Sequence, residues 1–352
     1  MNSTAEMVSN NNFFETINTL LSENKTFFCS RLPNSKRLTL SSGNTKKIPR
    51  SKIKGNGIFI MPFNEKNLGY KINPSFVYET KIEHKLNSNK NSLISLKEFT
   101  KNEDKESYKL SIEKLIEEIR LGKLSKIVFS KKITLDYSDS NQITIFKNIL
   151  DLYSEAFCYL FYTPNEGFWM GASPELLFKT EEDSISTMAL AGTKFNINSD
   201  WGDKEYSEQQ IVQDEILESL KPLCSSVAIG KIQTISAGKI QHLKTDFKGT
   251  TRASTIRLVN ALFPTSAVAG YPRKAALKLL SKHEEHERSL YSGFLGTCKD
   301  DDSSLFVNLR CINIKNDKIS FYVGSGITKD SVPDNEWNEI LKKSETMLSA
   351  IF

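Results

Sequence analysis

Short apolar runs joined by tight polar links dominate the chain after its first third. Residues 126–130, with the sequence Lys-Ile-Val-Phe-Ser, are rich in β-branched side chains and too few for a helix, which is typical of a buried strand. The same reasoning predicts strands over residues 57–63, 156–162, 167–170, 176–180 and 184–190. Neighbouring strands are therefore expected to follow one another directly along much of the chain.

Strand patterns continue towards the C-terminus. Further strands are predicted over residues 227–245 (two strands), 290–298, 305–314 and 319–323. Asn316 and Asp317 lie between the last two runs, and such residues favour the tight turn of a hairpin. Gly324, Ser325 and Gly326 are expected to end the strand pattern, because glycine weakens a strand interior.

Amphipathic helices are predicted between the groups of strands. Ile112, Leu115, Ile116 and Ile119 recur at the spacing of one helix face, and Gly122 follows as a helix end would. Similar patterns predict helices over residues 13–21, 142–153, 201–223, 254–262, 273–280 and 334–351. Residues 84–105 are polar and lack periodicity, so a surface loop is expected there.

This order of elements favours the α+β class, with large antiparallel β-sheets packed together and helices on the outside. Strict alternation of strand and helix is absent, and so are the glycine-rich motifs of nucleotide-binding folds. Residues 106–352 carry the clearest patterns and form the expected catalytic region. Residues 1–105 are expected to be the N-terminal part of the same fold.

The composition argues against several classes of protein but does not assign a function. The 352 residues are 39% hydrophobic and 25% charged, as in ordinary globular proteins, and the formal charge of +5 is spread along the chain, so no nucleic-acid partner is expected. The five cysteines contain no Cys-x-x-Cys motif, which favours reduced core residues. No apolar stretch is long enough to span a membrane and no signal-peptide pattern occurs, so a cytoplasmic protein without membrane contact is expected.

One stretch in the middle of the chain concentrates polar chemistry. Glu175 follows a proline at the start of an apolar run, which places a carboxylate beside a buried strand. Gly192 and Thr193 offer backbone N–H groups and a hydroxyl, which suit a ligand carboxylate. Glu205 and Glu208 lie three residues apart in a predicted helix and therefore share one face.

The last predicted helix repeats the acidic pattern. Glu336, Glu339 and Lys343 follow one another at i, i+3 and i+7, and so lie on one face. Carboxylates from two helices converge only around positive charge, because like charges at close range are costly. Mg²⁺ is the natural cation, since it binds one or two carboxylates, retains water and accepts a substrate oxyanion. Solvated helix faces are the alternative interpretation of both acidic pairs.

Ten short motifs occur in the order known from one enzyme family. They are Lys126–Ser130, Gly171–Glu175, Leu190–Thr193, Lys204-Glu205-x-x-Glu208, Gln241–Leu243, Pro264–Pro272, Tyr291–Gly293, Leu309–Cys311, Gly324-x-Gly326-Ile327 and Glu336-Trp337-x-Glu339 with Lys343. Over about residues 110–352 the chain thus resembles the chorismate-utilising enzymes, which comprise isochorismate, salicylate, anthranilate and aminodeoxychorismate synthases. The resemblance implies the large α+β fold of anthranilate synthase component I and a Mg²⁺ cofactor.

Within this family the chain is most similar to the isochorismate synthases of menaquinone or siderophore biosynthesis. The resemblance implies that Lys126 is the general base for water and Glu175 the general acid for the departing hydroxyl. Glu208 and Glu339 are expected to contact the metal, with Glu205 and Glu336 behind them through water. The expected substrate-binding residues are Gly192, Thr193, His242, Ala267, Tyr291, Arg310, Gly324, Gly326 and Lys343.

Two other products stay open at the level of sequence. A salicylate synthase would add pyruvate elimination in the same site, and an aminating synthase would use ammonia instead of water. No glutaminase region is present, so a monomer that acts on chorismate without an amidotransferase subunit is expected. The departures from the family pattern, such as Gln209 where histidine is usual, remove no reacting group.

Overall fold

The computed structural model describes residues 5–82, 100–195, 199–237, 240–299 and 302–351. Its N-terminal elements are β1 (Glu6–Met7), α1 (Asn10–Ser22), β2 (Phe27–Arg31), β3 (Arg37–Ile48), the 3₁₀ turn η1 (Arg50–Lys52), β4 (Gly57–Met61) and β5 (Gly69–Lys81). The middle of the chain forms α2 (Asn102–Arg120), β6 (Lys126–Asp136), α3 (Gln142–Leu152), β7 (Phe157–Thr163), β8 (Gly167–Ser173), β9 (Leu176–Glu181), β10 (Ser184–Lys194) and α4 (Asp203–Leu220). The remainder forms β11 (Cys224–Ile229), β12 (Gln233–Ala237), β13 (Ile240–Thr251), α5 (Thr255–Leu262), β14 (Gly270–Tyr271), α6 (Arg273–His283), β15 (Phe294–Lys299), β16 (Asp302–Val307), β17 (Cys311–Lys315), β18 (Lys318–Ile327) and α7 (Pro333–Ile351).

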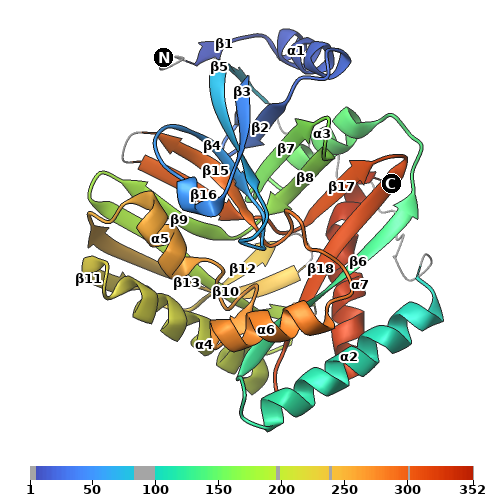
Figure 1. The fold of residues 1–352 in the computed structure, drawn as a ribbon, viewed down its shortest axis with the longest axis vertical. Coiled ribbons are helices and arrows are strands. Elements are labelled where there is room, and N and C mark those ends of the chain that lie inside the picture. Colours follow the sequence, from blue (N-terminus) through green and yellow to red (C-terminus); the bar gives the residue numbers. More distant parts are fainter. Residues whose placement is uncertain (1–4, 83–99, 196–198, 238–239, 300–301, 352) are drawn as a thin grey trace.

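The described strands form one connected, strongly curved sheet system, with helices on its outer faces (Figure 1). Apart from the short parallel pair β1–β5, the strand pairs in the described residues are antiparallel. The expected α+β arrangement of antiparallel sheet with external helices is therefore confirmed. Every helix in these residues is too short or too polar to cross a bilayer.

Strand alternation divides the core into layers. Along β7, Tyr159 contributes to an inner aromatic layer between the sheet faces, whereas Cys158 and Leu160 belong to an outer layer under the helices. In the inner layer Trp169 and Tyr291 stack on either side of Tyr322, with ring centroids 5.2 and 5.6 Å away. These rings fix the side of β18 that borders the site described below.

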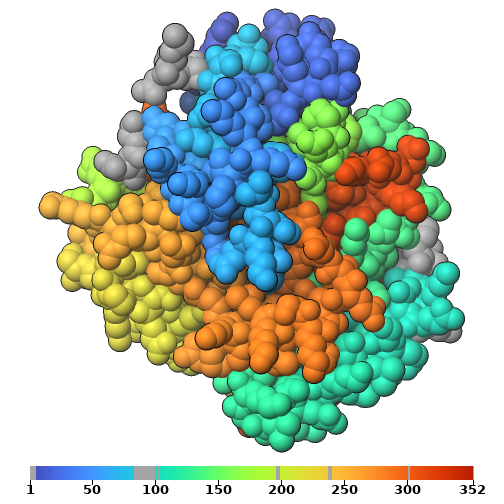
Figure 2. All heavy atoms as spheres, in the orientation of Figure 1, coloured from blue at the N-terminus to red at the C-terminus, as the bar shows by residue number. Residues whose placement is uncertain are grey.

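The N-terminal strands are part of the same sheet system. Strand β2 pairs with β7, and β4 pairs with β15 from the far end of the chain. In the space-filling view, the blue N-terminal residues lie directly against the orange segment that contains α6 (Figure 2). The backbone N–H of Phe63 donates to the carbonyl of Ser289 at this boundary.

The seven predicted helices are present, but two begin at least three residues earlier than expected, α1 by three and α2 by more. The predicted loop over residues 84–105 ends too late, because α2 starts at Asn102; residues 83–99 lie outside the described part. Lys105 and Lys109 pair with Asp334 of α7, and Tyr108 packs on Trp337. Tertiary contacts thus stabilise a first helical turn that is too polar to show a hydrophobic period.

Several strand predictions were wrong in their boundaries. The segment predicted as two strands forms three, β11 to β13, and β15 begins at Phe294 because residues 290–293 form a turn. The predicted strand 305–314 is divided into β16 and β17 by a break at Arg310, which adopts a left-handed φ of 49°. Strand β18 does not stop at Gly324 but continues to Ile327, because β6 pairs with it throughout.

Candidate active site

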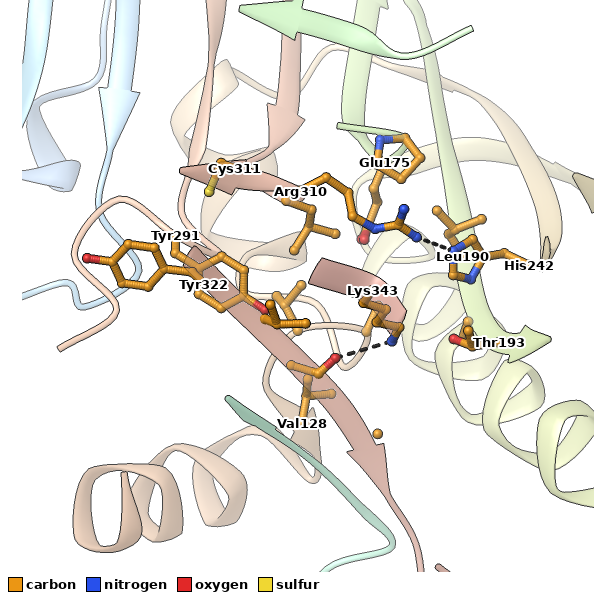
Figure 3. Close-up of a pocket in the computed structure, with 18 of the residues that line it drawn as sticks. Val128, Glu175, Leu190, Thr193, His242, Tyr291, Arg310, Cys311, Tyr322 and Lys343 are labelled. Carbon is orange, nitrogen blue, oxygen red and sulfur yellow. Dashed lines mark hydrogen bonds between the residues drawn. The ribbon is translucent and has the colours of Figure 1, made fainter. Parts of the chain in front are cut away.

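A cavity lies between strand β10 on one side and strand β18 with helix α7 on the other (Figure 3). The empty space within it, including its open mouth, amounts to about 790 Å³. The predicted site residues that line it are Glu175, Gly192, Thr193, His242, Glu208, Ala267, Tyr291, Arg310, Gly324, Gly326 and Lys343. Lys126, Glu205, Glu336 and Glu339 are not part of the lining.

Glu175 is fixed by the turn that connects β8 to β9. The Ser173 hydroxyl accepts from the N–H of Glu175 at 3.3 Å and donates to the carbonyl of Val307, and the Val307 N–H donates to the Glu175 carbonyl at 3.0 Å. The carboxylate itself is buried and accepts one hydrogen bond, from Thr265 at 3.2 Å. Burial raises its pKa to about 7 despite Thr265 and the nearby Lys126, so near neutral pH it retains a proton to give.

Lys126 begins strand β6 with a completely buried side chain. Its Nζ lies 2.9 Å from Oε1 of Glu208, but the angle does not suit a hydrogen bond, so the contact is an ion pair. A Cβ at Gly326 would lie 2.3 Å from the same Glu208 oxygen, so a side chain at this position would require the Glu208 carboxylate to move. Burial alone would raise the pKa of Glu208, but Lys126, with Lys204 beyond it, lowers the pKa below its ordinary value.

The end of β18 presents backbone groups towards the cavity. Gly324 and Gly326 face Ser130 and Val128 of β6, whose own N–H groups donate elsewhere, to Glu284 and to the carbonyl of Ala269. These register positions are therefore the non-hydrogen-bonded pairs of the ladder, and the backbone groups of both glycines point away from β6. The Gly324 carbonyl accepts from Lys343 at 3.2 Å on that side (Figure 3).

His242 and Arg310 form the opposite wall (Figure 3). The carbonyl of Gly192 lies 2.9 Å from Nδ1 of His242, and a guanidinium nitrogen of Arg310 lies 2.7 Å from Nε2. Because Arg310 only donates, Nε2 accepts and Nδ1 carries the proton. Burial, and then the charge of Arg310, hold the pKa of His242 well below its ordinary value, so the ring is neutral.

A bulge in β10 places Gly192 beside this histidine. Pairing with β13 shifts register between Ala191 and Thr193, and Gly192 adopts a left-handed φ of 69°. A Cβ there would lie 3.1 Å from the Cβ of Glu205 on α4, a close approach that favours glycine. The Thr193 side chain points from the bulge towards the cavity (Figure 3), and both residues line it.

The four predicted metal-binding acids lie on the first two turns of α4 and α7, with Glu205 and Glu336 in the first turn of each helix and Glu208 and Glu339 in the second. Glu336 contacts Lys204 at 2.7 Å, Glu339 contacts Lys343 at 2.6 Å, and Glu205 caps its own helix by accepting from Gly202 at 3.1 Å. Burial, reinforced by the charge of Glu339, raises the pKa of Glu336. The two helices therefore converge as expected, but the structure balances the acids with lysines.

The fit of these acids to a hard cation is mixed. Among the described residues no three histidine, cysteine or acidic side chains are gathered closely enough to hold a metal. However, Oε2 of Glu336 is buried and accepts no hydrogen bond from the described protein. Such an orphaned carboxylate oxygen, beside other carboxylates, is a donor that Mg²⁺ prefers. The donor chemistry fits, and metal binding would require the lysines to withdraw.

Comparison with known proteins identifies the family. The chorismate binding enzyme family matches residues 70–352. The chain belongs to this family. Isochorismate synthase MenF of Escherichia coli is 30% identical over 256 residues, which cover 68% of this chain and 59% of that protein, so the chain matches less than two thirds of MenF. Isochorismate synthase DhbC of Bacillus subtilis is 27% identical over 269 residues, 70% of this chain and 68% of that protein.

A solved structure supports the fold of this member of the chorismate binding enzyme family. The 2,3-dihydroxybenzoate-specific isochorismate synthase DhbC of Bacillus anthracis superposes with a TM-score of 0.81 at 23% identity, covering 95% of this chain and 99% of that one. At this identity the likeness concerns the architecture. It agrees with the expected fold.

Sequence reasoning missed part of the cavity wall. Apolar and aromatic side chains that were given no role also line it, namely Val128, Leu190, Leu309, Phe321, Tyr322, Val323 and Met347. Val128, Leu190 and Leu309 lie inside motifs that signalled the family. The remaining residues lie on β18 and α7. The spacing of apolar residues there shows that each element has two faces, but it does not show which face lines a cavity, so one sequence gives no signal for them.

Proposed function

We propose that the chain is a Mg²⁺-dependent isochorismate synthase, which converts chorismate to isochorismate. The observation that carries this proposal is the placement of a buried carboxyl group, Glu175, with a pKa of about 7 in the wall of a cavity that also contains Arg310. A protonated acid and a carboxylate-binding cation are what loss of a hydroxyl from a dicarboxylate requires. The similarity to MenF and DhbC supports the same activity.

The substrate's two carboxylates match two regions of the cavity. The planar fork of Arg310 suits the enolpyruvyl carboxylate, because it can donate two parallel hydrogen bonds. The ring carboxylate would lie near the bulge at Gly192 and Thr193, where both residues line the cavity and Thr193 offers a hydroxyl. The apolar wall that includes Leu190 and Val323 would contact the ring and exclude water.

The proposed reaction adds water at C2 and removes the hydroxyl at C4. For Lys126 to act as the base, its ammonium must first leave the ion pair with Glu208 and release a proton. It then takes a proton from water as the water oxygen bonds to C2, the ring double bonds shift, and the C4–O bond breaks as Glu175 donates its proton. One water enters and one leaves, so the substrate is isomerised. Both residues are buried, and Lys126 contributes to the charge environment of Glu175. Each is therefore placed to move a proton without bulk solvent.

Mg²⁺ would be held by Glu208 and Glu339, with Glu205 and Glu336 supporting them. When bound, it would neutralise the substrate's ring carboxylate and orient the ring. Lys343 already contacts Glu339 and could retain that contact. Oligomeric state and pathway play no part in the proposal, and no amidotransferase subunit is required.

Product identification from chorismate tests the proposal directly. Purified protein is incubated with chorismate and Mg²⁺, with and without ammonium, and products are separated by liquid chromatography. Isochorismate is expected in both incubations. Salicylate in place of isochorismate would support a salicylate synthase, and an aminated product that requires ammonium would support an aminating synthase. Unchanged chorismate would refute all three.

A further inference from the structure

Gln209, the residue after Glu208 in α4, has a completely buried side chain. Its amide oxygen accepts from the N–H of Ala191 at 2.8 Å. Its amide nitrogen donates to the carbonyl of Ala189 at 3.2 Å and to the hydroxyl of Thr245 at 3.1 Å. The partners fix the orientation of the amide, since a backbone N–H needs an acceptor and a carbonyl needs a donor.

These contacts occur where β10 has a strand neighbour on one side only. Strand β13 covers one edge along its length, whereas β9 pairs with the other edge over residues 184–186 alone. Beyond that point helix α4 lies against the open edge, and Gln209 satisfies one donor and one acceptor there. The side chain thus substitutes for a missing strand at Ala189 and Ala191.

The supported edge leads directly into the cavity. Gly192 follows Ala191, and its carbonyl accepts from His242, which in turn accepts from Arg310. Glu208, immediately before Gln209, faces the cavity from the same helix turn. Two consecutive residues of α4 therefore reach the acidic end of the site and the bulge that is suited to a carboxylate.

We propose that Gln209 is a positioning residue that sets the location of the Gly192 bulge relative to the acids of α4. It touches no reacting atom. Loss of its amide would allow Ala191 to move, and the bulge with it, so that the backbone N–H groups no longer match the substrate carboxylate. This inference rests on the proposed binding of the chorismate ring carboxylate at the bulge.

The test compares Gln209→Met with Thr245→Val. Methionine has a similar size and removes every hydrogen bond of the amide. Thr245→Val removes the third bond only and leaves Ala189 and Ala191 supported, so it is a matched buried control. We expect Gln209→Met to raise KM for chorismate roughly fivefold to tenfold, the effect of about one lost hydrogen bond. Its kcat should change less, and Thr245→Val should leave KM near the wild-type value.

Further variants separate positioning from stability. Thermal denaturation shows whether each protein is folded, and both variants are expected to melt at lower temperature. Gln209→His should recover much of the affinity, because an imidazole also offers one donor and one acceptor. If Gln209→Met does not fold, Gln209→Glu is tested instead. The glutamate keeps an oxygen that accepts from the N–H of Ala191, but its second oxygen lies against the Ala189 carbonyl and cannot donate to it. It too should raise KM.

Calorimetric titration with chorismate and Mg²⁺ distinguishes this inference from the proposed function. If the wild type binds chorismate but does not turn it over, the proposed function fails, and the affinities of Gln209→Met and Thr245→Val still decide the inference. An unchanged KM or affinity in a folded Gln209→Met protein, or equal losses in both variants, would overturn it. A wild type that does not bind chorismate would refute both.

Discussion

The two ends of the cavity differ in how their charge is balanced. At the acidic end each of three carboxylates contacts a lysine, namely Glu208 with Lys126, Glu336 with Lys204 and Glu339 with Lys343. At the opposite end the hydrogen bonds found for the Arg310 guanidinium in the described residues go to neutral partners, His242 and Thr346. Three of the four acids at one end are thus paired with lysines, whereas the guanidinium at the other end has no acidic hydrogen-bond partner among the described residues.

This difference indicates that the two ends receive a ligand in different ways. Arg310 is held in place by neutral groups and needs no rearrangement before it meets a carboxylate, which is the usual meaning of preorganisation. The acidic end must exchange lysine contacts for a cation. Metal binding should therefore be weak until substrate contributes its own carboxylate, and the two ligands should bind cooperatively.

The largest expected effect comes from breaking the acidic end. Activity should vanish with a chelator and return with Mg²⁺, and Glu208→Ala and Glu339→Ala should each lose metal-dependent turnover. In these variants Lys126 or Lys343 has lost its carboxylate partner, and its positive charge would repel the cation. Turnover at graded free Mg²⁺ measures this, with circular dichroism to confirm folding. A chelator-insensitive enzyme would show that the acids form only structural ion pairs.

Between the two ends, Glu175→Gln should lower kcat by roughly 10²–10⁴-fold, the range for one general acid or base. The amide preserves the shape of the turn and the contact with Thr265, so chorismate should still bind.

The wild-type rate should also fall as pH rises through about 7, because the acid form of Glu175 is lost. Rate–pH profiles of kcat measure this limb. Normal turnover in the Glu175→Gln variant would show that Glu175 has only a structural role in the turn.

The comparison also shows what one sequence can predict. The spacing of Glu336 and Glu339 correctly placed two acids on one helix face, and the order of the motifs correctly predicted the fold. Their partners could not be predicted, because Lys204 meets Glu336 across 132 positions in the sequence. The protonation of His242 likewise depends on Gly192 and on burial, which periodicity does not contain.

Residue identity was most informative where it was dictated by close approach. Gly326 was expected to interrupt β18, yet the strand continues through it, and the Glu208 carboxylate lies where a side chain at this position would begin. Gly171 similarly lies where a Cβ would meet the Arg310 carbonyl at 2.6 Å. Such positions mark a site in the sequence, although their neighbours become known only from the fold.

A smaller effect is expected from changing the preorganised end. Arg310→Lys retains the charge but loses the planar fork, so KM for chorismate should rise roughly tenfold to a hundredfold, the effect of losing a charged hydrogen bond. The value of kcat should fall less. Thr346→Val is the control, because it removes the 2.9 Å contact to the guanidinium but leaves its charge and its bond to His242. Equal KM values for wild type and Arg310→Lys would contradict a carboxylate-binding role.

The smallest expected effect is on the pH dependence of stability. It tests whether His242, which accepts a hydrogen bond from Arg310, is neutral in the folded protein. Since the pKa of His242 lies well below its ordinary value in the folded protein, the unfolded chain binds one more proton once pH falls below about 6.5. Its contribution to stability is thus complete above that pH and decreases by about 1.4 kcal/mol per pH unit below it.

His283 and His286, whose pKa values are also lowered, add to the same slope in the wild type. His242→Gln can still donate to Gly192 and accept from Arg310, so the folded structure should persist while the slope between pH 6 and 5 decreases by about one proton. Denaturant unfolding at several pH values measures this slope in wild type and variant. Equal slopes would mean that His242 is protonated in the folded protein and that Arg310 is not held by a neutral ring.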